Sequence, residues 1–235
     1  MTIWEYLENP GPWFNTEAYT PLQIGMFTLG AILWVVVYIV TIRRLISLKQ
    51  LAIPFIAVTL NIGTEITTAV FFVPDMGSAL VLAYWAWMVL DIFIVVGLFR
   101  YGHKQVRSPY LQQRFRMLMA VWIPLLFAVL YTFILTYDLP MAPLVSFTIN
   151  LVMSAAFVVL LFVPGQPPAS KLIGWAKFLG TGIIGVMFYT KYPENNALTA
   201  LYVAVAVVDA YYVYLLHSDA QPLGDPNDGL TRATV

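Results

Sequence analysis

Charge and cysteine are scarce in this chain of 235 residues. Only 10% of the residues are charged and 60% are hydrophobic, and the mean hydropathy is +0.79, whereas a soluble globular domain carries about 25% charged residues. The absence of cysteine excludes disulfides, thiolate nucleophiles and cysteine-metal sites. Two histidines, His103 and His217, are too few and too far apart to indicate a zinc site. The formal net charge is zero, so no nucleic-acid partner is expected. The balance indicates an integral, multi-pass membrane protein.

Long apolar stretches define the expected fold. A transmembrane helix needs about 20 mostly apolar residues, and seven stretches qualify. We therefore expect an all-α membrane protein with seven transmembrane helices in a domain that covers residues 22–217. The predicted spans are residues 22–42, 52–73, 79–99, 117–137, 142–163, 172–190 and 197–217.

Basic residues indicate the orientation of these spans. They cluster in the connections after the first, third and fifth spans, whereas the opposite side carries mainly acids and a single Lys191. By the positive-inside rule, the N-terminus is expected outside and the C-terminus in the cytosol. Residues 1–21 have no basic region typical of a signal peptide and are expected to lie on the outer headgroup layer. The polar residues 218–235 are expected to form a disordered cytosolic tail.

Three acids fall within the predicted span cores. Counting residues from the span ends places Glu65, Asp91 and Asp209 near the membrane midplane. We expect no lysine or arginine at that depth, because Lys177 lies close enough to the cytosolic end of its span to reach the surface. An unpaired acid in an apolar interior is least costly when it stays protonated. Intramembrane acids are usually functional, although each could instead be a hydrogen-bonding contact between helices.

Polar and aromatic side chains accompany these acids at helical spacing. Asn61 lies one turn from Glu65; Trp87 and Tyr84 lie one and two turns from Asp91; Tyr202 and Tyr212 share a face with Asp209. Asn150 is a further polar residue within the fifth span. Acids beside aromatic rings suit carbocation chemistry, because ring faces stabilise positive charge. The competing interpretation is that these aromatics serve packing and the membrane interface.

Other membrane functions fit the residues to different degrees. A retinal protein needs a lysine in the seventh span, and none is present. A seven-helix receptor agrees with the topology alone. A proton-coupled transporter of small molecules remains open, since buried acids also serve as proton relays. The acids, however, form one layer rather than a chain across the membrane. From the residues alone, transporter ranks slightly above enzyme.

Short motifs along most of the chain resemble one family. They are "LNIGTEI" with Glu65, "WAWMVLDIFIV" with Asp91, "RYGHKQ", "INLVMSAAF", "GWAKFLGTG" and "VVDAYYVYLL" with Asp209. In order and spacing they resemble the small seven-span membrane terpene cyclases of fungal meroterpenoid and indole-diterpene pathways and their bacterial relatives. The family often has a tryptophan immediately before its second-span glutamate, where this chain has Thr64.

The resemblance implies a class II-like terpene cyclase that starts a carbocation cyclisation with a proton. Its essential acids correspond to Glu65 and Asp209, and its third-span aspartate and tryptophan to Asp91 and to Trp87 or Trp85. We expect Glu65 and Asp209 to be the catalytic acid pair and Asp91 to tune it. The expected substrate-binding residues are Asn61, Tyr84, Trp87, Asn150, Tyr202 and Tyr212.

The implied substrate is a hydrophobic prenylated small molecule, activated at an epoxide or a terminal alkene. No metal or other cofactor is expected, and the chain lacks both the DDxxD motif of metal-dependent cyclases and the DxDD motif of soluble proton-initiated ones. The expected location is the plasma membrane in a bacterium or the endoplasmic reticulum in a fungus.

Overall fold

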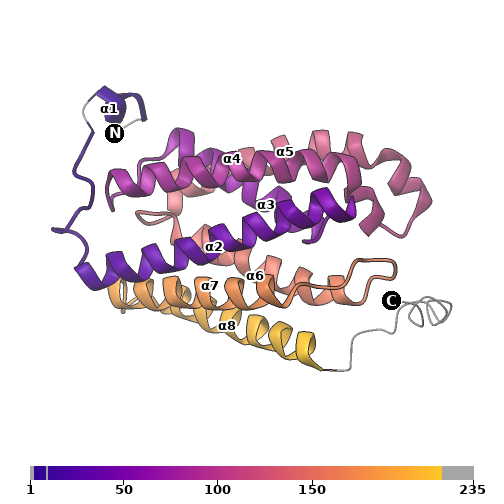
Figure 1. The fold of residues 1–235 in the computed structure, drawn as a ribbon. Helices are drawn as coiled ribbons and strands as arrows, with labels where there is room; N and C mark the ends of the chain where they lie inside the picture. Colours follow the sequence, from indigo (N-terminus) through magenta and orange to yellow (C-terminus); the bar gives the residue numbers. More distant parts are fainter. Residues whose placement is uncertain (1–2, 9, 219–235) are drawn as a thin grey trace.

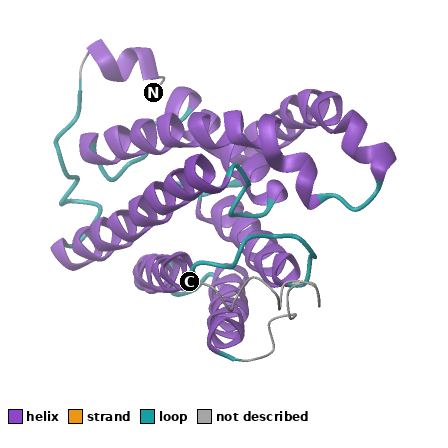
Figure 2. Cartoon of the chain, turned by 45° about the vertical axis from the view of Figure 1, so that its right-hand side comes forward, coloured by secondary structure: helices purple, strands orange, loops and turns teal. Residues whose placement is uncertain are grey.

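A computed structural model of the chain describes residues 3–8 and 10–218. These residues form helices joined by loops, and no strand occurs among them (Figures 1 and 2). The expected tail of residues 218–235 lies, except for Ser218, outside the described residues. The elements in chain order are α1 (Ile3–Glu8), α2 (Pro21–Leu48), α3 (Phe55–Ile66), the π-helix η1 (Thr67–Phe71), α4 (Ser78–Tyr101), the 3-10 helix η2 (Gly102–Gln105), α5 (Pro109–Tyr137), α6 (Pro143–Leu161), α7 (Lys171–Lys191) and α8 (Asn196–His217).

Helices occur at all seven predicted spans, but only six are long and apolar enough to cross a membrane by length and composition. The exception is the second, in which α3 and η1 together cover only Phe55–Phe71. The helix at the fourth predicted span is α5, which begins at Pro109, eight residues before that span. The prediction left these residues out because they include Arg114 and Arg116, which hydropathy places outside the hydrocarbon. The all-helical class is confirmed, whereas the full count of seven crossings is not.

Six helices surround a central space, and α5 packs outside them (Figures 1 and 2). The neighbours around the ring are α2, α4, α3, α6, α8 and α7, which packs again on α2. The helices α2 and α7 lie close together at Gly30, where an added Cβ would lie 2.8 Å from the Gly180 carbonyl oxygen. The helices α2, α4, α6 and α8 begin at the left end of Figure 1, where α3 with η1, α5 and α7 end. We call these two ends of the bundle the left and right ends.

The helix α3 packs on α4, α5 and α6, and eight of its 12 residues are buried. Directly after Glu65 and Ile66 the backbone widens into the π-helix η1. Threonine hydroxyls bind the carbonyl oxygens of the preceding turn here: Thr67 donates to Gly63 O at 2.9 Å and Thr68 to Thr64 O at 3.0 Å. Single π-turns within helices often occur at functional sites, where they redirect side chains.

The N-terminal segment folds against the left end of the bundle. Asn15 N donates to Met76 O at 2.8 Å, and the Tyr19 hydroxyl donates to Asp75 Oδ1 at 2.5 Å. Burial, helped by Asp75, raises the pKa of Tyr19 above its ordinary value, so its hydroxyl remains a donor. Trp13 stays exposed. The N-terminal segment is thus hydrogen-bonded to the α3–α4 connection. Its contact with lipid headgroups remains a prediction.

Candidate active site

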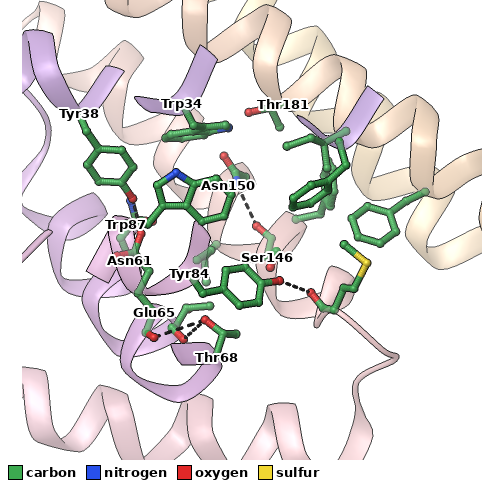
Figure 3. Close-up of a pocket in the computed structure, with 17 residues that line it drawn as sticks. Trp34, Tyr38, Asn61, Glu65, Thr68, Tyr84, Trp87, Ser146, Asn150 and Thr181 are labelled. Atoms are coloured by element: carbon green, nitrogen blue, oxygen red, sulfur yellow. Dashed lines mark hydrogen bonds between the residues drawn. The ribbon is translucent and has the colours of Figure 1, made fainter. Parts of the chain in front are cut away.

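A cavity opens inside the ring of helices, between α2, α3, α4, α6 and α7 (Figure 3). Neither α5 nor α8 contributes to its wall. Seven of its 17 lining residues are aromatic and six are threonine, serine or asparagine, with Glu65 as the one acid. The lining residues are Phe27, Trp34, Tyr38, Asn61, Thr64, Glu65, Thr68, Tyr84, Trp87, Met141, Ser146, Phe147, Ile149, Asn150, Thr181, Ile184 and Phe188.

Two of the three predicted acids meet beside this cavity. Glu65 on α3 and Asp91 on α4 carry neighbouring buried carboxyl groups. Glu65 is 8% exposed and lines the cavity, whereas Asp91 is 1% exposed and lies behind it. Among the described residues, neither Glu65 Oε2 nor either Asp91 oxygen has a hydrogen-bond partner. Two carboxylates so placed repel each other, so the arrangement favours a shared proton.

The other oxygen of Glu65 is held by a tyrosine. The hydroxyl of Tyr38, on α2, donates to Glu65 Oε1. Asn61 Nδ2 donates in turn to the Tyr38 oxygen at 3.5 Å, and Asn61 lies one turn before Glu65, as predicted. Tyr38 is buried, and its position one turn from Trp34 puts both side chains at the cavity wall. Figure 3 shows the Tyr38 hydroxyl pointing toward Asn61 and Glu65.

Aromatic rings form much of the remaining wall. Tyr84 and Trp87 of α4 both line the cavity as predicted, with ring centroids 5.7 Å apart. Trp85 does not line it; its indole donates to Ala69 O at 2.8 Å. Of the two tryptophans that the resemblance offered, Trp87 therefore faces the cavity.

The predicted polar residue of α6 also lies at the cavity. Asn150 Nδ2 donates to Ser146 O at 2.9 Å, while its carbonyl oxygen is buried without a hydrogen-bond partner among the described residues. The Thr181 hydroxyl on α7 is likewise buried and unpaired. These two oxygens leave hydrogen-bonding capacity for a ligand in the cavity.

Asp209 lies in a different environment from the one we expected. It is not part of this cavity, and Glu65 has Asp91 rather than Asp209 as its neighbouring acid. Both Asp209 oxygens accept from Lys177 Nζ, at 2.6 and 2.7 Å. The expectation that no basic residue shares the depth of the acids, with Lys177 at the surface, was wrong: Lys177 is 1% exposed. Lys177 lies only about 9 Å from the start of α7, but α6 and α8 cover it there.

The two tyrosines predicted to accompany Asp209 also lie outside this cavity. Tyr202 is in contact with Phe147, with centroids 4.5 Å apart, and lines a separate groove between α7 and α8. Tyr212 is 3% exposed and packs on Phe157 in the core toward the right end of the bundle. The structure therefore does not bring either residue to the cavity of Glu65.

Twelve of the 17 lining residues were absent from the predicted set, among them Trp34, Tyr38, Thr68 and Thr181. Only the aromatic pair carried a signal, because Trp34 and Tyr38 are one helical turn apart and therefore share a face. No group of three or more His, Asp or Glu side chains that could hold a metal ion occurs in the described part of the chain. The site is thus an acid pair in an aromatic cavity.

Comparison with known proteins identifies the family of the chain. Residues 12–219 match the Pyr4-like transmembrane terpene cyclases, and the chain belongs to this family. The Pyr4-family terpene cyclase mfmH of Annulohypoxylon moriforme is 22% identical over 213 residues, which are 85% of this chain and 87% of that protein. No solved structure matches the chain. The family membership confirms the resemblance and gives no support to the transporter alternative.

Proposed function

We propose that the protein cyclises a prenylated small molecule by proton-initiated, metal-independent carbocation chemistry, with Glu65 as the proton donor. The observation that carries this proposal is the Glu65–Asp91 acid pair at the wall of an aromatic cavity. Glu65 is the member that faces the cavity, so its proton can reach a substrate there. Asp91, which is enclosed behind it, shares the proton and does not touch the substrate.

The proposed reaction leaves the mass of the substrate unchanged. The Glu65 proton passes to an epoxide oxygen, and the C–O bond to the more substituted carbon breaks; with an alkene, the proton adds to carbon. The neighbouring double bonds then close rings onto the cation. Loss of a proton from carbon forms the final double bond, and that proton restores the acid pair. The Tyr38 hydroxyl holds the Glu65 carboxyl group in place at the cavity wall.

The aromatic wall suits the charge that this reaction develops. Trp34, Trp87 and Tyr84 line the cavity, and the faces of aromatic rings stabilise cations. Asn61 supports Tyr38, and Asn150 offers an unpaired oxygen to the substrate. The substrate itself is an isoprenoid chain joined to a second group, since the family acts on terpenoids.

For Asp209 we propose support of the site rather than proton donation. Its charge is matched by Lys177, which also donates to Ser154 Oγ at 2.7 Å. Ser154 in turn donates to the backbone oxygen of Asn150 at 2.7 Å. The network therefore links α6, α7 and α8 one turn below two residues of the cavity wall, Asn150 and Thr181. Tyr212 belongs to the packing around it.

We also propose the orientation that the charges favour. The basic loops meet at the right end of the bundle, where Lys104 Nζ donates to Lys49 O at 3.0 Å and Arg107 donates to Phe162 O at 3.3 Å. This end would face the cytosol, and the N-terminal segment would face the outside.

The decisive experiment uses the full chain in proteoliposomes. A farnesyl-substituted phenol and its terminal epoxide are supplied with a metal chelator present, and products are separated by chromatography and mass spectrometry. We expect a cyclic isomer of unchanged mass, and reaction of the alkene substrate in D₂O should place one deuterium in the product. Glu65→Gln should abolish the product, because an amide cannot donate the required proton.

Glu17→Gln is the matched control, since Glu17 is an exposed acid outside the cavity. It should behave like the wild type. Full activity of folded Glu65→Gln would refute the assignment of the donor. Loss of activity on chelation, restored only by a metal ion, would refute the metal-independent mechanism.

A further inference from the structure

A second depression lies between α7 and α8, beside the cavity. It is lined by Phe178, Gly182, Gly185, Val186 and Tyr189 on α7 and by Tyr202, Val203 and Ala206 on α8, among others. Val186 and Val203 are more than half exposed at its rim, and Tyr189 is half exposed. We call this feature the α7–α8 groove. On a membrane-embedded bundle it faces the lipid and not water.

The α7–α8 groove contains more polar groups than a surface that only contacts acyl chains requires. The hydroxyls of Thr181, Thr199 and Tyr202 are buried and have no hydrogen-bond partner among the described residues. A buried hydroxyl without a partner costs free energy unless a ligand or water satisfies it. The groove therefore fits a molecule that is mainly apolar but carries a few oxygen atoms.

The groove also borders the cavity directly. Phe147 and Thr181 line both spaces, so the groove and the space that Glu65 faces adjoin at these two side chains. Phe147 is bordered by Gly185, where an added Cβ would lie 3.5 Å from the Phe147 ring. Gly182 leaves a larger opening, because an added Cβ there would meet nothing within 4 Å. The open side of the groove is therefore kept free by a residue without a side chain.

We propose that the α7–α8 groove binds the isoprenoid chain of the substrate on its way from the bilayer to the cavity, with Thr181 as the contact between the two spaces. The inference rests on the proposed cyclase function. A prenylated molecule dissolves in the hydrocarbon, so a lateral path requires no transfer through water. The groove supplies the apolar wall for the chain and hydroxyls for the oxygen atoms of the attached group.

The first test measures occupancy without turnover. A farnesyl phenol that carries a photoreactive diazirine on its chain is added to proteoliposomes, and labelled peptides are mapped by mass spectrometry. We expect labels on α7 and α8 at the groove, displaced by excess farnesyl phenol but not by added phospholipid. Gly182→Leu should remove these labels, because its side chain fills the groove. Glu65→Gln should keep them, which separates this inference from the proposed chemistry.

The second test compares kinetics. Gly182→Leu should raise the apparent KM, expressed as mole fraction of substrate in the bilayer, about tenfold, the loss expected when roughly two methylene groups lose their buried contacts. The kcat should stay within about twofold, since chemistry occurs in the cavity. Val186→Trp, at the exposed rim, is a second variant that needs no change in the interior.

The chain offers matched controls for both variants. Gly25 on α2 also leaves open space for a Cβ and lies in neither the cavity nor the groove. Val129 on α5 is 64% exposed, like Val186 a lipid-facing valine. Gly25→Leu and Val129→Trp should leave labelling and KM unchanged. Labels displaced equally by phospholipid, or an unchanged KM in Gly182→Leu and Val186→Trp, would overturn the inference.

Discussion

Lys177 and Asp209 form an ion pair of 2.6 Å in the interior of the bundle, with exposed side-chain fractions of 1% and 3%. The ammonium group uses all three of its donors, two on Asp209 and one on Ser154. A buried pair of this kind contributes little net stability compared with two apolar residues, but removal of one partner leaves an uncompensated charge. This asymmetry gives a way to separate a supporting Asp209 from a reacting one.

Single and double variants of the pair should behave very differently. Lys177→Met or Asp209→Leu alone should lower the free energy of unfolding by about 3–5 kcal/mol and reduce cyclase activity. The double variant should recover most of both losses, because no unpaired charge remains. Thermal unfolding in detergent and product formation in proteoliposomes measure the two quantities. A double variant that folds like the wild type but stays inactive would instead mean that the Asp209 carboxylate takes part in the reaction.

The Tyr38 hydroxyl should matter for rate more than for binding. Tyr38→Phe keeps the ring at the cavity wall but removes the donor to Glu65 Oε1. A hydrogen bond of about 1 kcal/mol corresponds to roughly a fivefold to tenfold loss of kcat, with KM within about twofold. Tyr211→Phe, on an exposed face of α8, is the control and should have no effect. A rise in KM with unchanged kcat would mean that Tyr38 contacts substrate instead of positioning the acid.

Asp138 supports the start of α6, outside the membrane-spanning part of α5. It accepts from the backbone amides of Leu139, Leu144 and Val145 at 2.8–2.9 Å, and so holds a turn in which Met141 and Ala142 have positive φ. Burial raises the pKa of Asp138 above its ordinary value of 3.8, against the opposing effect of the three amides. At a pH between the ordinary pKa and the raised pKa of Asp138, the folded protein binds more protons than the unfolded chain. The contribution of Asp138 to stability therefore falls as the pH rises through this range.

Asp138→Asn should remove this slope, because the amide does not titrate. The Tm of the wild type should therefore fall relative to the Tm of Asp138→Asn as the pH rises from about 4. Thermal unfolding in detergent between pH 4 and 7 measures this difference. A difference that moves in the opposite direction would mean that the three amides outweigh burial.

The sequence predicted which residues lie within helices far better than which face of each helix turns inward. The spans matched helices because length and hydropathy depend only on composition along the chain. The helices α2, α4, α6 and α8 are apolar around most of their circumference, so a lipid-facing and a core-facing side cannot be told apart by periodicity. Tyr212 was therefore assigned to the cavity although α8 turns it into the core.

The sequence also reveals more about the depth of a buried acid in the bundle than about the residue with which it pairs. Counting residues from the helix ends placed Glu65 and Asp91 at one level, and they do meet. The same counting failed for Lys177, because a position near a helix end can still be covered by neighbouring helices. The pairing of Lys177 with Asp209 depends on the packing of α7 on α8, and no local pattern in either segment specifies that contact.

Trp34 tests whether the aromatic wall stabilises charge or only fills space. It lines the cavity beside Tyr38, with ring centroids 6.3 Å apart. Trp34→Phe keeps a ring face and should lose little, whereas Trp34→Leu should lower kcat about tenfold to thirtyfold, the effect of a cation–π contact of about 1–2 kcal/mol. Trp34→Leu should also release more partly cyclised products, since carbocation intermediates that the ring no longer stabilises are deprotonated earlier. Trp122→Leu, on α5 outside the cavity, should match the wild type in rate and product ratio. Equal losses in Trp34→Phe and Trp34→Leu would show that the indole acts by its volume, and the product ratio measured by chromatography decides between the two.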